Sequence, residues 1–147
     1  SLAYDHALKR LDKNVRVFSR ACPLFVPLVE EGWLNHEVTR HVARLYLKPL
    51  LKNKIDALVL GCTHYPLLKT VLRRVVGRVE LIDSAEETAK AVRSRLEQDG
   101  LLLHGRRKGR VSYFSSDDPV KFARVGSRFV GWDIKKVQRI RLEGIDG

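Results

Sequence analysis

The sequence contains no methionine and only two cysteines, Cys22 and Cys62. Two thiols cannot build a disulfide framework, so a reduced, cytoplasmic setting is expected. No apolar run approaches the ~20 residues that a membrane-spanning helix needs, and no membrane partner is expected. Because Ser1 is not a translation start, the chain is expected to lack the beginning of a longer protein.

Metal-ligand spacing is also missing from the sequence. Cys22, Cys62, His64 and the pair His36 and His41 match no zinc-site spacing. His36 and His41 are five residues apart and fall on different faces of a helix. We therefore expect no metal site.

The composition is that of a soluble globular chain, with 44% hydrophobic and 31% charged residues in a length of 147. The net charge of +11 favours acidic partners. The only dense basic run is GRRKGR, residues 105–110, and the other cations are scattered. We interpret most of them as solvated helix faces, with nucleic-acid binding as the less favoured alternative.

Hydrophobic periodicity predicts an alternation of strands and helices. This order predicts an α/β fold with a mostly parallel sheet flanked by helices. Helices are predicted over residues 3–11, 23–33, 36–53, 65–77, 85–100 and 117–131, and strands over residues 15–21, 56–62, 78–84, 109–116 and 137–143.

Polar residues and glycines mark the expected helix boundaries. Asn35 is a predicted N-cap, and Ser84 with Glu87 has the spacing of a capping box. Gly32 and Gly77 are predicted to end the helices that precede them.

The stretch LVLGCTHYPLL, residues 58–68, places Cys62 where a buried strand gives way to a polar turn. Ligands of parallel sheets bind outside the carboxyl ends of the strands. The helix start at Pro66 favours an anion or a thiolate there, and His64 can donate or relay a proton. The residues alone leave two interpretations open, a reactive thiol or a small hydrophobe that ends a strand.

Two acidic residues, Glu30 and Glu31, close the helix predicted over residues 23–33. Such a pair usually lies in solvent, although carboxylates that point into a cleft can tune an acid or a base. Cys22 follows a predicted strand and lacks a comparable polar setting, so we interpret it as structural.

Three segments together resemble the second half of glutamate racemase: ALVLGCTHYPLL (57–68), RACPLFVPLVEEG (20–32) and LIDSAEETA (81–89). The resemblance implies the Asp/Glu racemase fold. It also implies a cofactor-independent interconversion of L- and D-glutamate, which supplies D-glutamate for peptidoglycan. Two thiols on opposite faces of the substrate then exchange protons with its Cα, without pyridoxal phosphate or metal.

The resemblance also implies roles for individual residues. Cys62 is one of the two catalytic thiols, and His64 assists it with the proton. Glu30 supports the acid–base chemistry, and Thr63 binds glutamate together with Cys62 and His64. A homodimer is expected, because dimers are usual in the family.

The family's first half carries an Asp-Ser-Gly motif and a partner cysteine in a Cys-Asn-Thr setting, and neither is found in this sequence. We therefore expect the N-terminal half of the two-domain fold to be missing. Residues 1–83 are predicted to be the second domain, and residues 84–147 the segment that completes the first. The chain alone is expected to be inactive, and its part after Ser84 to pack abnormally, swap or be poorly ordered.

Other functions remain as alternatives at this point. An aspartate or hydantoin racemase of the same superfamily would use a similar thiol. A basic nucleic-acid-binding module or a non-catalytic remnant would use the scaffold without the chemistry.

Overall fold

The computed structural model describes residues 2–103, 105 and 109–141, and it forms two units, Ser1–Leu102 and Leu103–Gly147. Part of the basic run and the end of the last predicted strand lie outside the described residues. The first unit contains α1 (Ala3–Leu11), α2 (Phe25–Glu30), α3 (Glu37–Leu51), β1 (Ala57–Leu60), the 3-10 helix η1 (Tyr65–Leu68), α4 (Lys69–Val76), β2 (Glu80–Asp83) and α5 (Ser84–Gln98). The second contains β3 (Tyr113–Ser115), α6 (Pro119–Val130) and β4 (Val137–Arg139).

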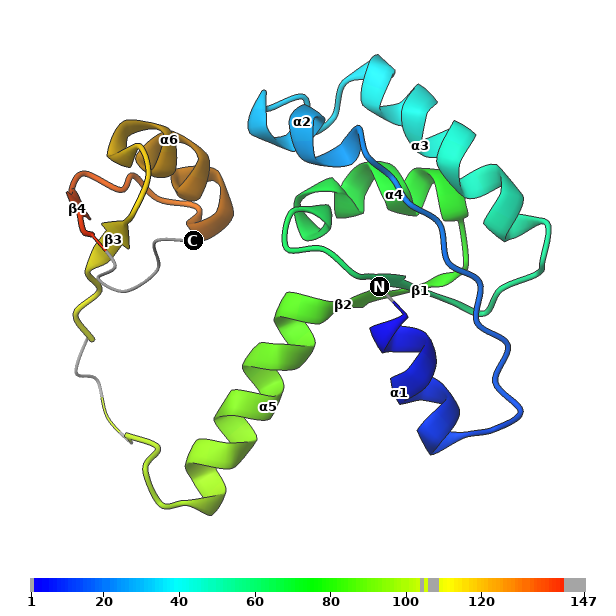
Figure 1. The fold of residues 1–147 in the computed structure, drawn as a ribbon, viewed down its shortest axis with the longest axis horizontal. Coiled ribbons are helices and arrows are strands. Elements are labelled where there is room, and N and C mark those ends of the chain that lie inside the picture. The colour runs from blue at the N-terminus through cyan, green and yellow to red at the C-terminus, as the bar shows by residue number, and fades with distance from the viewer. Residues whose placement is uncertain (1, 104, 106–108, 142–147) are drawn as a thin grey trace. The chain divides into compact units, whose positions relative to one another are not determined.

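The predicted α/β class is confirmed, and the described strands pair in parallel. β1 pairs with β2 from Ala57 opposite Glu80, and β3 pairs with β4 from Tyr113 opposite Val137. Each sheet has two strands, so the strands do not form the single sheet that the alternation suggested. In Figure 1, α2, α3 and α4 lie on one side of the β1–β2 pair and α1 lies on the other.

The strand predicted over residues 15–21 is wrong. This segment is irregular, and it pairs with no strand of the described part of the chain. Its alternation is still visible, because Val15 and Val17 are half-buried while Arg16 and Phe18 are exposed. The alternation of apolar and polar residues thus predicts which side chains face the rest of the protein. A strand also needs a neighbouring strand with which its backbone forms hydrogen bonds.

Two of the predicted caps are replaced by the residue next to them. His36, and not Asn35, caps α3, where its Nδ1 accepts a hydrogen bond from the Val38 amide at 3.2 Å. Asp83, and not Ser84, caps α5. Ser84 instead donates its hydroxyl hydrogen bond to the carbonyl of β1 at 3.0 Å, which ties the start of α5 to the strand.

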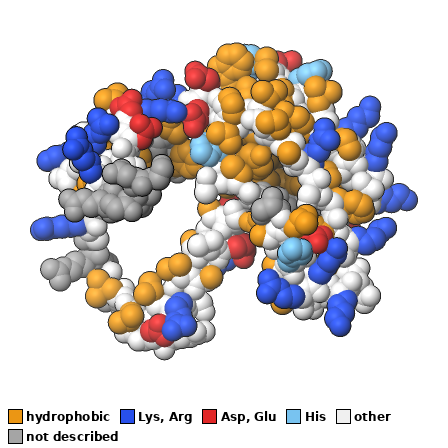
Figure 2. Space-filling view, in the orientation of Figure 1, with side chains coloured by type: hydrophobic (Ala, Val, Ile, Leu, Met, Phe, Trp, Pro, Cys, Tyr) orange, Lys and Arg blue, Asp and Glu red, His pale blue; other side chains and the backbone are white. Residues whose placement is uncertain are grey.

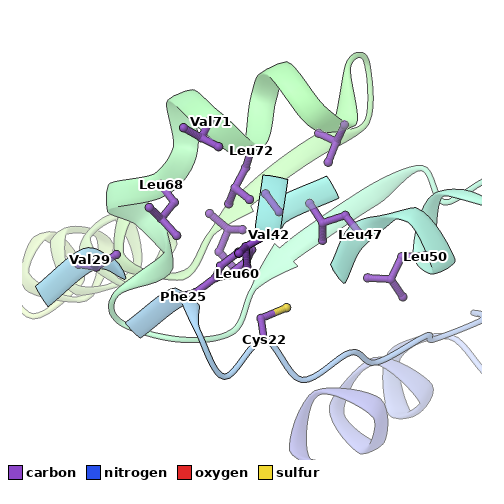
Figure 3. Packing of buried hydrophobic residues seen from close by; sticks show 12 residues of the cluster. Cys22, Phe25, Val29, Val42, Leu47, Leu50, Leu60, Leu68, Val71 and Leu72 are labelled. Carbon is purple, nitrogen blue, oxygen red and sulfur yellow. The ribbon is translucent and has the colours of Figure 1, made fainter. Parts of the chain in front are cut away.

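One hydrophobic cluster holds the first unit together (Figure 3). Phe25, Leu60, Leu68 and Leu72 are its largest fully buried side chains. They come from α2, β1, η1 and α4, so the cluster joins the segments on either side of the turn after β1. α3 covers it with Val42, Ala43, Leu47 and Leu50.

The described residues of the second unit, and α5 before it, are poor in buried side chains. Neither α5 nor α6 contains a buried residue. Figure 2 shows apolar side chains along α5. Large apolar residues are exposed in this part of the chain, namely Val92, Leu101, Leu103, Val111, Phe114, Val120, Phe122, Phe129, Trp132 and Ile140. Within the second unit, a two-stranded sheet and one helix offer too little surface to bury that unit's own apolar side chains.

Membrane-spanning helices are not found in the part of the chain that the structure describes, since none of its helices is long and apolar enough.

Asp83 is a buried carboxylate that joins β2, α4 and α5. Its Oδ1 accepts from the amides of Ala85 and Glu86 at 2.9 and 3.2 Å, and its Oδ2 lies 3.1 Å from Lys69 Nζ. Burial alone raises the pKa of Asp83, but the two amides and the Lys69 ammonium outweigh it and lower that pKa below 3.8. The stabilisation is therefore fully present above 3.8 and is lost as the pH falls through the folded-state pKa.

This carboxylate gives a first prediction. Asp83→Asn keeps an oxygen that can cap α5 but removes the charge that Lys69 pairs with. We expect a loss of about 2 kcal/mol in the free energy of unfolding at neutral pH, measured by urea unfolding. The difference from wild type should shrink as the pH falls below 3.8, because the wild-type carboxyl then begins to take up its proton.

Asp99→Asn is the matched control, since Asp99 pairs with Arg95 on the exposed end of α5. It should cost less than about 0.5 kcal/mol. Equal losses for the two variants, or a loss at Asp83 that does not change with pH, would contradict the role of the buried pair.

Candidate active site

A tight turn after β1 presents the residues singled out in the sequence. The Tyr65 amide donates to the Cys62 carbonyl at 3.2 Å, and the Leu67 amide donates to the His64 carbonyl at 3.2 Å. The turn then continues into η1 rather than directly into an α-helix. Cys62 and His64 are half-buried, and Thr63 between them is exposed.

Glu30 is the last residue of α2, and the way that helix ends fixes its position. The amide of Gly32 donates to Val29 and the amide of Trp33 donates to Leu28, both at 2.9 Å. This pair of bonds is a Schellman motif, and it requires the left-handed backbone that Gly32 adopts at φ 80°. The prediction that Gly32 ends this helix is confirmed, and with Val29 buried the carboxylate of Glu30 is directed toward the turn.

The structure brings Glu30, Thr63 and His64 together. Oε1 of Glu30 lies 3.5 Å from Nε2 of His64, and Nδ1 of His64 lies 3.2 Å from the Thr63 hydroxyl. A carboxylate only accepts, so a proton on Nε2 faces Glu30 and leaves Nδ1 to accept from Thr63. When the ring is doubly protonated, both nitrogens donate and the hydroxyl accepts. The contacts of His64 with Glu30 and Thr63 can therefore form in either protonation state of the ring.

The two cysteines have different surroundings. Cys22 is buried in the core, and its Sγ donates to the Arg20 carbonyl at 3.7 Å. Burial, partly opposed by the Arg20 charge, raises the pKa of Cys22 to about 11. Cys22 thus stays a thiol at neutral pH, which supports its interpretation as structural, whereas Cys62 is half-buried in the polar turn.

Tyr65 is a site residue that the sequence analysis did not single out. Its hydroxyl donates to the Cys22 carbonyl at 3.2 Å, across 43 positions of sequence. Its ring lies edge-on to Phe25, with 5.2 Å between centroids. Nothing local in the sequence signals contacts over such a separation, although the tyrosine stands within the motif around Cys62.

No group of three or more His, Cys, Asp or Glu side chains within residues 2–103, 105 and 109–141 is arranged to hold a metal ion.

Comparisons with curated proteins and with solved structures find relatives of this chain. No protein-family model matches the chain. A glutamate racemase from Geobacter metallireducens is 50% identical over 144 residues, which are 97% of this chain and 53% of that protein. The structure of glutamate racemase from Francisella tularensis in complex with D-glutamate matches 96% of this chain and 53% of its own, with a TM-score of 0.85 and 31% identity. The Thermus thermophilus enzyme, solved with β-chloro-D-alanine, matches 84% of this chain and 47% of its own, with a TM-score of 0.75 and 44% identity.

The fold and these matches relate the chain to α/β amino-acid racemases, over about half of their length. More particularly, it is homologous to glutamate racemase and corresponds to a part of that protein. The chain spans about half the length of the curated relatives it matches.

Proposed function

We propose that this chain supplies one side of a glutamate racemase active site, with Cys62 as one of the two proton-transferring thiols. Glu30, His64 and Thr63 belong to the same site. The observation that carries the proposal is the chain of contacts from Glu30 through His64 to Thr63, next to the half-buried Cys62, in a homologue of glutamate racemase. The bound D-glutamate of the Francisella relative supports the choice of substrate.

The proposed chemistry moves one proton at each face of the substrate. With one enantiomer, the Cys62 thiolate takes the Cα proton, and the electron pair stays on the substrate's α-carbon. A second thiol, outside this chain, then gives its proton to the opposite face. His64 takes a proton from Cys62 or returns one, and the Glu30 carboxylate stabilises the imidazolium that forms. Thr63 binds the substrate and orients the ring.

We also propose that residues 84–147 complete the domain that carries the second thiol. α5 and α6 contain no buried residue, and the apolar side chains near them are exposed. Such surfaces mark contacts with further polypeptide. The complete enzyme would be a cytoplasmic homodimer that supplies D-glutamate for peptidoglycan.

A chimera tests this function. The portion of the Geobacter metallireducens racemase that this chain does not match is joined to the chain, in the order of the relative. We expect this protein to racemise L-glutamate, followed by circular dichroism of the amino acid, and to prefer glutamate to aspartate. The 147-residue chain alone should be inactive, because a single thiol serves only one face.

Two results would contradict the proposal. One is a folded chimera that racemises neither glutamate nor aspartate while the complete Geobacter enzyme is active in parallel. The other is racemisation of glutamate by the purified 147-residue chain.

A further inference from the structure

We propose that Tyr65 is a positioning residue that holds the turn of Cys62 and His64 against the helix of Glu30. The inference rests on the proposed function for its catalytic consequence, while the contacts themselves belong to this chain. The pair of His64 and Glu30 joins two separate segments, and its 3.5 Å separation depends on how these segments are held.

Tyr65 contacts both segments at once. Its amide donates to Cys62, so it is part of the turn. Its hydroxyl donates to the Cys22 carbonyl, and its ring meets the Phe25 ring at 88°. Cys22 lies three residues before α2, Phe25 is the first residue of this helix, and Glu30 is its last. Tyr65 therefore fixes the start of the helix that carries the carboxylate.

The Tyr65 hydroxyl stays protonated in the neutral pH range and can therefore donate its hydrogen bond. Burial disfavours the phenolate and raises the pKa of Tyr65 to about 12, with further contributions from Cys22 and Cys62. The hydroxyl therefore keeps its proton and donates to the Cys22 carbonyl throughout the neutral range. A phenylalanine keeps the ring contact and loses only this bond.

Tyr46 provides a closely matched control. Tyr46 lies on α3, and the centroid of its ring is 5.4 Å from that of Phe25, the ring that Tyr65 also contacts. Its hydroxyl accepts a hydrogen bond from the Leu24 amide at 3.4 Å. Tyr46 thus bonds to the same segment before α2, and neither its ring contact nor its hydrogen bond involves the turn after β1. Tyr65→Phe and Tyr46→Phe each remove one hydroxyl from the same aromatic cluster.

The kinetic test uses the active chimera and a double-mutant cycle with Glu30→Gln. We expect Tyr65→Phe to lower kcat about tenfold with KM unchanged, because misplaced catalytic groups lose rate rather than binding. Glu30→Gln should then cost little in the Tyr65→Phe background and its full effect in the Tyr46→Phe background. Tyr46→Phe alone should leave kcat unchanged.

A structural measurement on the 147-residue chain tests the role of Tyr65 separately from the racemase activity. Nuclear Overhauser contacts between the His64 ring and the Glu30 side chain should persist in Tyr46→Phe and be lost in Tyr65→Phe. If the wild-type chimera is inactive, the proposed function fails and these contacts alone decide the role of Tyr65. Contacts retained in Tyr65→Phe, or additive effects of Tyr65→Phe and Glu30→Gln on kcat, would overturn the inference.

Discussion

Replacing Cys62 by alanine in the chimera should lower glutamate racemisation about a thousandfold or more, because a proton-transferring group is removed outright. The loss should also be asymmetric. In deuterated solvent, the remaining thiol can still exchange the α-proton of one enantiomer, namely the one whose α-proton points toward that thiol. Exchange should therefore persist for one glutamate enantiomer and vanish for the other, as followed by mass spectrometry or proton NMR.

Cys22→Ala is the matched control for this experiment. Cys22 is the only other cysteine of the chain, and it stands three residues before α2. It is buried, and its raised pKa of about 11 keeps it protonated. We expect a stability loss of about 1 kcal/mol with racemisation retained. Symmetric loss of exchange in Cys62→Ala, or equal loss in both variants, would argue against Cys62 as a proton-transferring thiol.

The sequence predicted most elements of the fold because their signals are local. Gly32 and Gly77 end their helices as expected, and both adopt positive φ. The apolar run that became β1 and the helices around it were likewise visible as hydrophobic patterns. The caps of α3 and α5 were each misplaced by one residue. In both cases two polar residues are adjacent in the sequence, and which of them caps the helix depends on backbone geometry that the sequence pattern does not show.

Sheet membership was the part that local patterns did not determine. The segment 15–21 alternates as a strand does, yet it pairs with no described strand. β1 also looked fully buried in the sequence, whereas only Leu60 of its four residues is buried in the structure. The apolar character of a strand reflects the sheet for which it evolved. An apolar run therefore predicts a strand but does not show how deeply each of its residues is buried.

The candidate site shows the same division between local and distant information. Cys62, Thr63 and His64 are consecutive, so one motif identified them together. Glu30 was suggested by resemblance, and its contact with His64 is a tertiary fact. Tyr65 was not singled out because its hydrogen bond to the Cys22 carbonyl joins segments 43 positions apart, which no sequence periodicity connects.

The second large effect is expected from a substitution in the hydrophobic cluster of the first unit. Leu72 of α4 is 1% exposed and packs with Leu60, Leu68 and Phe25 in the cluster of Figure 3. Leu72→Ala removes buried methyl groups and leaves a cavity between α4 and the strand. We expect it to cost about 3–4 kcal/mol in the free energy of unfolding of the first unit. That is a large part of the ~5–15 kcal/mol that stabilises a typical domain.

Leu45→Ala is the control for Leu72→Ala, since Leu45 lies on α3 with 59% of its side chain exposed. It should change the unfolding free energy by less than about 0.5 kcal/mol. Because the two units need not unfold together, both variants are made with Trp132→Phe, so that the fluorescence of Trp33 reports the first unit alone. Similar urea midpoints for Leu72→Ala and Leu45→Ala would contradict the expected contribution of the buried Leu72 side chain to the stability of the first unit.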